Sequence, residues 1–309
     1  MNNRSILTFF LALIFLSSCE QYLEVELPGQ EPKLVMNVLL EPSDTLKVFL
    51  TKSEGVLEGN QNDGFEVVEN ATVLFKDPSG ETFLLDFADK KSHFGRDAYY
   101  YLANPVVNPD VEYELIAETT GFPSINSKQR LPVRVAIKDV QFSNLGPSSY
   151  WDGADEYEIV VTFDDLPGRD FFEISGSIYG LDTLIYNGDT TLHSYSAILN
   201  PEAVNPAYRK DFRMRPALLF KDVFLTGENS QIAFRTTIWR EMDIDITLNL
   251  YHVTESYFLY YDTADFQVYN NGDFLSQPVL VYNNINNGLG VFMARNGDQR
   301  VIRIHRDQD

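Results

Sequence analysis

The amino-acid sequence predicts a mainly β protein, in which an N-terminal β-sandwich is followed by a larger β-rich domain with one short-to-medium helix. Three observations predict this fold class. Of the 309 residues, 44% are hydrophobic and 22% are charged, which is typical of a globular chain. Short runs of β-branched and aromatic residues recur along the chain, separated by turn-forming residues. One late segment repeats its apolar residues at helical spacing.

The first domain is expected over residues 33–133. A run at 71–76 ends in the turn-forming residues 77–80, and another run at 83–87 follows at once, so these two strands are expected to form a hairpin. Turn signals roughly every dozen residues are typical of a β-sandwich. The expected strands of this domain are 33–40, 46–51, 71–76, 83–87, 99–102, 113–118 and 128–131.

The second domain is expected over residues 134–309 and is also rich in strands. Residues 189–217 show no clear pattern, apart from a short helix expected after Pro201. The last two strands, at 289–294 and 300–305, are expected to form a hairpin through Asn296-Gly297. The other expected strands are 134–142, 157–163, 171–179, 231–239 and 244–253.

A helix is expected over residues 255–268, with Thr254 as its N-cap. Apolar residues recur there at spacings of three and four, which gives the helix one apolar face. These residues are Tyr257, Tyr260, Tyr261, Ala264 and Val268.

The N-terminus has the pattern of a secretory signal. Arg4 precedes an apolar run at residues 6–16, which is too short to cross a bilayer comfortably. Residues 16–19, Leu-Ser-Ser-Cys, then resemble a bacterial lipobox, at which signal peptidase II cuts before a cysteine that becomes diacylated. We therefore predict a signal peptide over residues 1–18 and lipidation of Cys19, the only cysteine of the chain. The alternative is an ordinary signal peptide with an incidental cysteine.

Residues 19–32 are expected to form an acidic tether between the lipid and the first strand. Glu20, Glu24 and Glu26 follow the cysteine, and acidic residues in this place resemble the signal with which Bacteroidota export lipoproteins to the cell surface. The sequence thus predicts a lipoprotein of the outer membrane that faces the cell exterior. The alternative is a tether whose charges only keep it solvated.

Charge and rare residue types argue against several function classes. Asp and Glu number 45 against 24 Lys and Arg, so the formal net charge of −21 would repel the phosphates of nucleic acid. The four histidines fall in separate segments without zinc-binding spacing, and the sequence has no Gly-x-Ser-x-Gly motif. We therefore expect no enzyme, no cofactor, no metal and no nucleic-acid partner.

Several polar positions have a simpler structural explanation than a site. The acidic loops at 60–64 and 151–156 offer oxygen ligands for calcium, but neither has the spacing of an EF-hand loop, which favours solvated turns. Asp243 and Asp245 would act as a glycosidase pair only with a partner across a cleft, so a polar strand face is the better interpretation. His252 is in phase with the apolar face of its strand, which favours a hydrogen-bonded structural histidine over a ligand.

Tyr150 and Trp151 are the candidate contacts for a partner or ligand. They lie in a loop rich in Gly, Pro and Ser, with no apolar strand around them. Exposed aromatic side chains of this kind anchor protein interfaces or stack on sugar rings. A loop that folds back over the core is an equal alternative, and both interpretations stay open.

A second candidate segment near the C-terminus is rich in Asn and Gly. Both residue types tolerate positive φ, so a tight crossover loop is favoured over ligand contact. The residues concerned are Asn283, Asn286, Asn287, Gly288 and Gly290.

Four features carry a resemblance to a known family: the lipobox, the Pro-rich entry into the strand at 33–40, the segment 220–227 and the Asn-rich segment 278–292. Together they resemble the DUF4249 family of Bacteroidota outer-membrane lipoproteins. Members of that family are commonly encoded beside TonB-dependent receptors. The resemblance therefore implies a non-enzymatic accessory or binding subunit of such a receptor, or of a related outer-membrane complex. The first domain also resembles immunoglobulin-like and transthyretin-like (carboxypeptidase-regulatory) sandwiches, which says little about activity.

Two other classes of function remain open. One is a surface lipoprotein that binds or hydrolyses glycans, and the other is a structural subunit of an outer-membrane assembly complex. A pair of carboxylates that face each other across a pocket would favour the hydrolase. A flat aromatic patch without such a pair would favour a binding protein.

Overall fold

The computed structural model describes residues 31–42, 45–53, 66–93, 96–186, 189–210, 212–225, 227–239, 243–270 and 279–304. These residues form many strands, one α-helix, α2 (Glu255–Asn270), and two 3-10 helices, η1 (Pro206–Tyr208) and η2 (Asp222–Phe224), so the predicted mainly β fold class with one helix is confirmed. The strands are β1 (Leu34–Leu40), β2 (Leu46–Lys52), β3 (Thr72–Lys76), β4 (Thr82–Leu84), β5 (Asp86–His93), β6 (Arg96–Ala103), β7 (Glu112–Glu118), β8 (Ile125–Arg130), β9 (Ile137–Pro147), β10 (Ala154–Phe163), β11 (Phe171–Tyr186), β12 (Asp189–Ile198), β13 (Glu202–Ala203), β14 (Leu218–Lys221), β15 (Ser230–Trp239), β16 (Asp243–Val253) and β17 (Leu289–Ile304).

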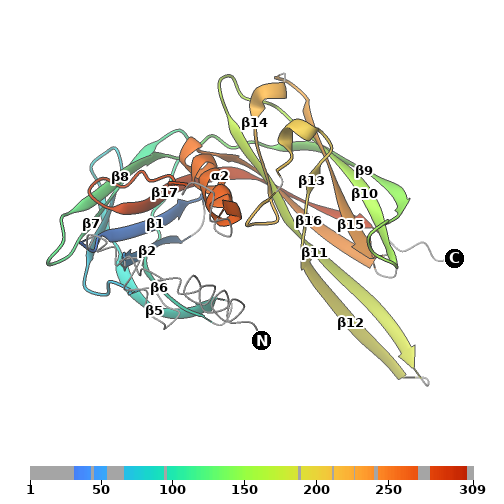
Figure 1. Ribbon diagram of the computed structural model, residues 1–309, viewed down its shortest axis with the longest axis horizontal. Coiled ribbons are helices and arrows are strands. Elements are labelled where there is room, and N and C mark those ends of the chain that lie inside the picture. Colours follow the sequence, from blue (N-terminus) through green and yellow to red (C-terminus); the bar gives the residue numbers. More distant parts are fainter. Residues whose placement is uncertain are drawn as a thin grey trace, which may run out of the picture.

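The strands form three sheets, which make two sandwiches side by side (Figure 1). The longest sheet has the order β12-β11-β16-β17-β1-β2-β6-β5, with β14 paired to β11. One end of it shares a core with the sheet β4-β3-β7-β8, and the other end shares a core with the sheet β13-β15-β10-β9. The long sheet is thus common to both sandwiches.

Alternating side chains place each core between two sheets. In β1, every second residue from Leu34 to Leu40 is buried, as expected for a strand with one apolar face. β16 follows the same rule, because Ile244, Ile246 and Leu248 all point into the second core. The expected hairpin between 71–76 and 83–87 is present as the antiparallel pair β3 and β4. The expected second strand is divided, however, because residues 86–87 belong to β5 of the long sheet.

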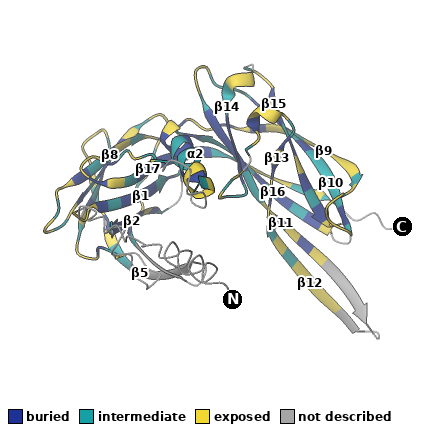
Figure 2. Ribbon diagram, viewed as in Figure 1, coloured by how far each residue is buried: buried dark blue, intermediate teal, exposed yellow. Residues whose placement is uncertain are grey.

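The expected helix at 255–268 is present as α2, and the N–H of Tyr257 donates to the Thr254 hydroxyl at 3.4 Å. Tyr257 and Ala264 are buried, whereas Val268 is exposed. Tyr257 and Phe258 pack with Val291 and Met293 of β17, so α2 covers the long sheet where the two sandwiches meet (Figures 1 and 2). None of the described helices is long and apolar enough to span a bilayer.

The expected hairpin through Asn296-Gly297 is wrong, because β17 is one continuous strand. Its first part pairs in parallel with β1 and its second part pairs antiparallel with β16. A Cβ at position 297 would lie 2.0 Å from the carbonyl oxygen of Leu250, so this glycine allows close approach of β16. The side chain of Asn296 is buried and donates to the carbonyl of Pro132 at 2.9 Å. Asn296-Gly297 favours a turn by its local sequence, but pairing with β16 in the folded protein places this dipeptide inside β17.

The predicted boundary between residues 133 and 134 does not separate two independent cores. The first core contains Ile285, Phe292 and Ala294, which come from the C-terminal part of the chain. Because β17 lies in both sandwiches, residues 33–133 lack one strand of their own sheet. The likeness of the first sandwich to transthyretin-like folds stays a prediction.

Residues 189–217, which show no clear pattern in the sequence, contain β12, β13 and η1. β12 pairs with β11 along its full length, and the two strands project beyond the second sandwich as an arm (Figure 1). The short helix expected after Pro201 is the 3-10 helix η1, which Asn205 caps.

Candidate functional site

A cleft of about 440 Å³ lies where the two sandwiches meet, beside the start of α2. The first sandwich contributes Gln129 and Arg130, and the second contributes Arg169, Asp170 and His252. Its walls therefore carry charges of both signs, which suits a polar occupant better than an apolar one.

Asp170 and His252 contact each other at the edge of this cleft. His252 Nε2 lies 3.1 Å from a carboxylate oxygen of Asp170, and His252 Nδ1 lies 3.0 Å from the carbonyl oxygen of Val133. Both side chains are mostly buried. The histidine thus has two hydrogen-bond partners, and its ring orientation is fixed by both.

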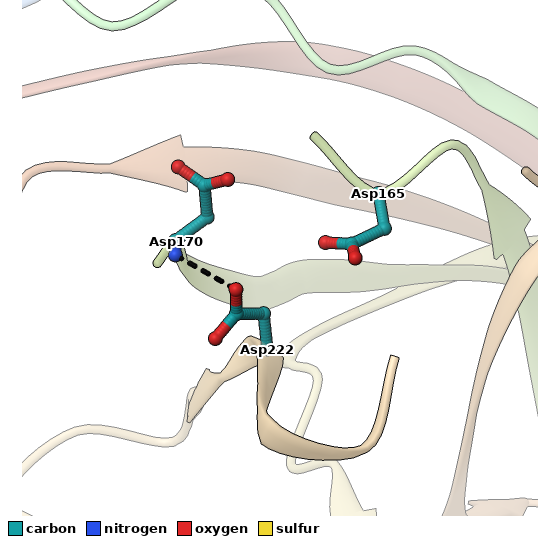
Figure 3. Close-up of side chains that lie close together, drawn as sticks. All are labelled: Asp165, Asp170 and Asp222. Carbon is teal, nitrogen blue, oxygen red and sulfur yellow. Dashed lines mark hydrogen bonds between the residues drawn. The ribbon is translucent and has the colours of Figure 1, made fainter. Parts of the chain in front are cut away.

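Asp170 also belongs to an acidic cluster, which it forms with Asp165 and Asp222 (Figure 3). One carboxylate oxygen of each residue lies within 4.8 Å of the others. Asp165 and Asp170 come from the turn between β10 and β11, and Asp222 begins η2 after β14. The pairing of Phe171 with Lys221 brings the two segments together, and the N–H of Asp170 donates to Asp222 at 3.0 Å.

The cluster concentrates negative charge that is poorly compensated. Burial raises the pKa of Asp165 and of Asp170, and the charge of Asp222 adds to both shifts. The N–H of Gly227 and the nearby His252 act in the opposite direction without cancelling them. In the described part of the chain, none of the three carboxylates forms an ion pair with a lysine or arginine. The arrangement offers oxygen ligands to a cation.

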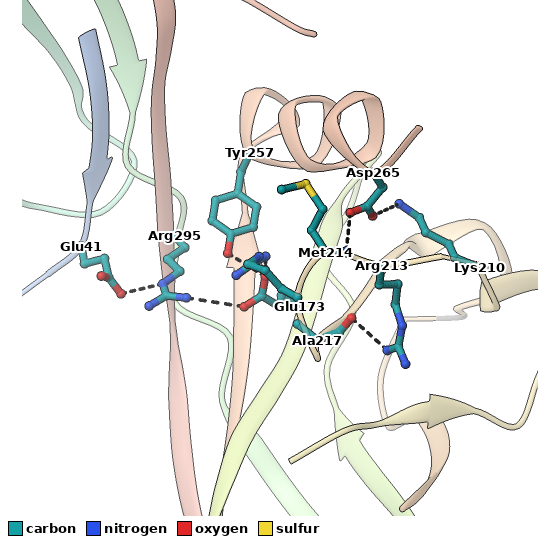
Figure 4. Close-up of polar contacts among 10 residues, drawn as sticks. Glu41, Glu173, Lys210, Arg213, Met214, Ala217, Tyr257, Asp265 and Arg295 are labelled. Carbon is teal, nitrogen blue, oxygen red and sulfur yellow. Dashed lines mark hydrogen bonds and ion pairs between the residues drawn. The ribbon is translucent and has the colours of Figure 1, made fainter. Parts of the chain in front are cut away.

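A separate network of buried charges lies under α2 and is centred on Glu173, whose side chain has no solvent exposure (Figure 4). The Arg215 guanidinium and the Tyr257 hydroxyl each donate to one Glu173 oxygen at 2.6 Å. Arg295 lies 3.5 Å from the other oxygen and 2.6 Å from Glu41. Each group in this network has a partner, so it is suited to holding the structure and offers no free atom for chemistry.

Burial opposes the charged form of Arg215 and of Arg295, yet the pKa of both is raised. Burial is the largest single effect at both groups, but Glu173, Tyr257 and Tyr261 together outweigh it at Arg215. At Arg295, Tyr257, Glu41 and Tyr251 together do so. Both guanidinium groups therefore stay charged inside the junction of the two sandwiches.

The predicted contact residues Tyr150 and Trp151 are exposed, with 89% and 60% of their surface accessible. They lie in the turn between β9 and β10, where both N–H groups face the Ser148 hydroxyl. A Cβ added to Gly153 would lie 3.7 Å from the ring of Trp239, which is 38% exposed at the end of β15. Both tryptophans of the chain thus lie at the same end of the second sandwich.

The Asn/Gly segment before β17 is held by its own hydrogen bonds. Asn283 donates to the carbonyl of Gly288 at 3.2 Å, and Asn286 donates to Asn126 of β8 at 2.9 Å. Asn287 and Gly290 have positive φ, and a Cβ at 290 would lie 2.3 Å from the carbonyl oxygen of Met36. The segment therefore packs between β8 and β17, and these side chains are engaged in hydrogen bonds within the protein.

The remaining sequence candidates are either outside the described residues or engaged elsewhere. Cys19, Glu20, Glu24, Glu26 and the loop at 60–64 lie outside them. In the loop at 151–156, Asp155 accepts from Asn144 at 2.9 Å and Glu156 lies 3.8 Å from Arg235. Asp245 pairs with Arg303 at 3.2 Å on the outer face of β16.

The fold defines a class of protein first: two β-sandwiches built on one shared sheet. Within that class, the chain belongs to the DUF4249 family, described as a domain of unknown function, whose model matches residues 20–300. The predicted family is therefore confirmed, and the match covers both sandwiches. No curated protein matches the chain.

The acidic cluster is the feature that sequence reasoning missed. Asp165 lies just after the expected strand at 157–163, and Asp222 lies far from it in the sequence, in the family segment 220–227. Only the pairing of β11 with β14 shows that these carboxylates meet. The available signal was weak: aspartates that directly follow or precede β-rich runs.

Proposed function

We propose that this protein is a lipid-anchored outer-membrane lipoprotein that faces the cell exterior and binds a partner as a non-enzymatic subunit. The proposed partner is a TonB-dependent receptor or a related outer-membrane complex. Membership of the DUF4249 family supports this proposal, and so do two features of this sequence: the lipobox at residues 16–19 and the acidic residues that follow Cys19.

The observation that carries the proposal is the group of exposed aromatic residues Tyr150, Trp151 and Trp239. Tyr and Trp are enriched among the residues that dominate binding energy at protein interfaces. Leu181 and Leu192 of the β11–β12 arm are exposed as well.

The test is recovery of outer-membrane proteins with the full-length lipoprotein after mild detergent extraction. Trp151→Ala is expected to reduce recovery of the partner about thirtyfold, which corresponds to roughly 2 kcal/mol for one well-buried anchor. Phe266→Ala is the matched control, because Phe266 is an aromatic residue of similar exposure (55%) on α2. Undiminished recovery with Trp151→Ala would remove this surface from the interface.

The same aromatic residues favour glycan binding as the second candidate, because such rings stack on sugars. If the wild-type chain recovers no outer-membrane protein but is retained on a polysaccharide column, and Trp151→Ala abolishes this retention, glycan binding replaces the subunit proposal. Retention that depends on Trp151 and is unaffected by Phe266→Ala would distinguish stacking from a general loss of structure.

A further inference from the structure

Unsatisfied buried polar atoms gather at one place in this molecule. Among the described residues, three buried side-chain atoms have no hydrogen-bond partner: one oxygen of Asp165, one oxygen of Asp170 and the hydroxyl of Tyr208. Buried polar atoms in native proteins are nearly always paired, so each exception needs a bound ion, a bound water or a function to explain it. All three exceptions belong to the acidic cluster or adjoin it.

Tyr208 is the observation that is independent of the carboxylates. Only 9% of its surface is exposed, and its ring packs on Phe220 and Phe224, which flank Asp222. The Tyr208 side chain therefore lies beside the segment that carries Asp222, and its hydroxyl has no hydrogen-bond partner there. The N–H of Phe224 faces this hydroxyl, but no hydrogen bond of normal geometry forms.

The spacing of the carboxylates fits a calcium ion. Ca²⁺ binds oxygen at about 2.3–2.6 Å, so ligands on opposite sides of the ion are about 4.6–5.2 Å apart. The three carboxylate oxygens lie within 4.8 Å of one another, which matches the spacing of ligands around one such ion. Ca²⁺ also accepts irregular geometry and fills its remaining positions with water.

We propose that Asp165, Asp170 and Asp222 bind one Ca²⁺ ion, with the Tyr208 hydroxyl hydrogen-bonded to water of its coordination shell. The ion would fasten the turn between β10 and β11 to the end of β14. It would also fix the Asp170–His252 pair at the edge of the cleft between the sandwiches. This site lies apart from the exposed aromatic residues and does not depend on the proposed partner.

The test uses the full-length detergent-solubilised protein, stripped with EGTA and then titrated with CaCl₂. The midpoint temperature of thermal unfolding, Tm, should rise on the order of 5 °C when the Ca²⁺ concentration is a hundred times its Kd. MgCl₂ at equal ionic strength should shift it much less, because Mg²⁺ requires shorter bonds and keeps its waters. No shift with CaCl₂, or an equal shift with MgCl₂, would overturn the calcium assignment.

Two aspartate variants separate a ligand role from a structural role. Asp165→Asn should abolish the response to Ca²⁺, while its Tm in EGTA equals or exceeds that of the wild type because a repelling charge is gone. Asp164→Asn is the matched control, since the neighbouring Asp164 pairs with Lys138 outside the cluster, and it should keep the full response. A full Ca²⁺ response in Asp165→Asn would refute the site.

Terbium luminescence decides the matter if a variant fails to fold. Tb³⁺ replaces Ca²⁺ at oxygen sites and emits when a nearby tyrosine is excited. The wild type should show emission that added CaCl₂ removes, and Tyr208→Phe should weaken this emission strongly. Absence of Ca²⁺-sensitive emission from the wild type would contradict the proposal.

Discussion

Glu173 is a carboxylate without solvent exposure, and its partners compensate for the loss of hydration. Arg215 and the Tyr257 hydroxyl contact one oxygen, and Arg295 approaches the other. A buried pair of this kind adds little net stability compared with apolar residues, but removal of one partner leaves the others charged and unpaired. A single substitution of Glu173 should therefore show how much this network contributes to stability.

Glu173→Gln should lower the free energy of unfolding by about 3 kcal/mol or more, because Arg215 then lacks its counter-charge in a buried position. The measurement is the urea midpoint at neutral pH. Glu158→Gln is the matched control, since Glu158 pairs with Arg235 at 3.3 Å on the surface and should cost less than about 1 kcal/mol. Equal effects of the two substitutions would show that the network is not held by charge.

Asp298 gives a prediction of pH dependence. Burial acts to raise the pKa of Asp298, but the N–H of Ile137 and the Arg134 guanidinium, at 3.0 and 2.5 Å, outweigh it and lower the pKa below its usual 3.8. The unfolded chain therefore binds this proton more readily, so the contribution of Asp298 is present above about pH 4 and is lost as the pH falls through the folded pKa.

Asp298→Asn should destabilise the protein by about 1–2 kcal/mol at pH 7, since its bonds to Arg134 and to the Ile137 N–H are charge-assisted. The difference from the wild type should shrink below about pH 4 and vanish at lower pH. Urea unfolding at a series of pH values measures this. A difference that stays constant with pH would mean that the charge of Asp298 contributes nothing.

At the scale of elements, β17 decides the architecture. Residues Leu289 to Ala294 pair with β1, and residues Arg295 to Ile304 pair with β16. Alternating patterns correctly predict most strands because burial of one face is a local property of the sequence. These patterns do not predict which strands pair with each other, because pairing depends on contacts between residues far apart in the chain.

The role of β17 predicts that residues 31–133 do not fold alone. Their sheet would lose the neighbour of β1, and their core would lose Phe292 and Ala294. The same segment joined by a Gly/Ser linker to residues 279–294 should fold. Dispersion of amide signals in the NMR spectrum measures this, and a dispersed spectrum for residues 31–133 alone would show that β17 is dispensable.

At the scale of the whole molecule, two sandwiches share one sheet. The turn with the exposed residues Tyr150 and Trp151 joins β9 to β10 in the second sandwich, whereas the cleft lies at the junction. A tethered protein of this shape can present one end to a partner while the other end stays near its anchor. This holds only if Cys19 is lipidated, which the lipobox predicts.

Cys19→Ala should abolish labelling by a radioactive fatty acid and leave the protein soluble or as an uncleaved precursor. The reason is that diacylation needs the cysteine thiol. Membrane fractionation with the fatty-acid label is the measurement. Ser18→Ala keeps a small residue before the cysteine and should remain labelled, whereas label on Cys19→Ala would contradict the lipobox prediction.

The sequence by itself determined the fold class, the family, the helix that begins after Thr254 and most strand positions. These follow from local patterns: alternation, helical spacing and short motifs. Only the tertiary structure decided that Asn296-Gly297 lies inside a strand, that β17 joins both sandwiches, and that Asp165, Asp170 and Asp222 meet. Each of these features depends on which strands pair although they lie far apart in the sequence. The free energy of such pairing comes from contacts throughout the folded chain, so a short stretch of sequence does not predict it.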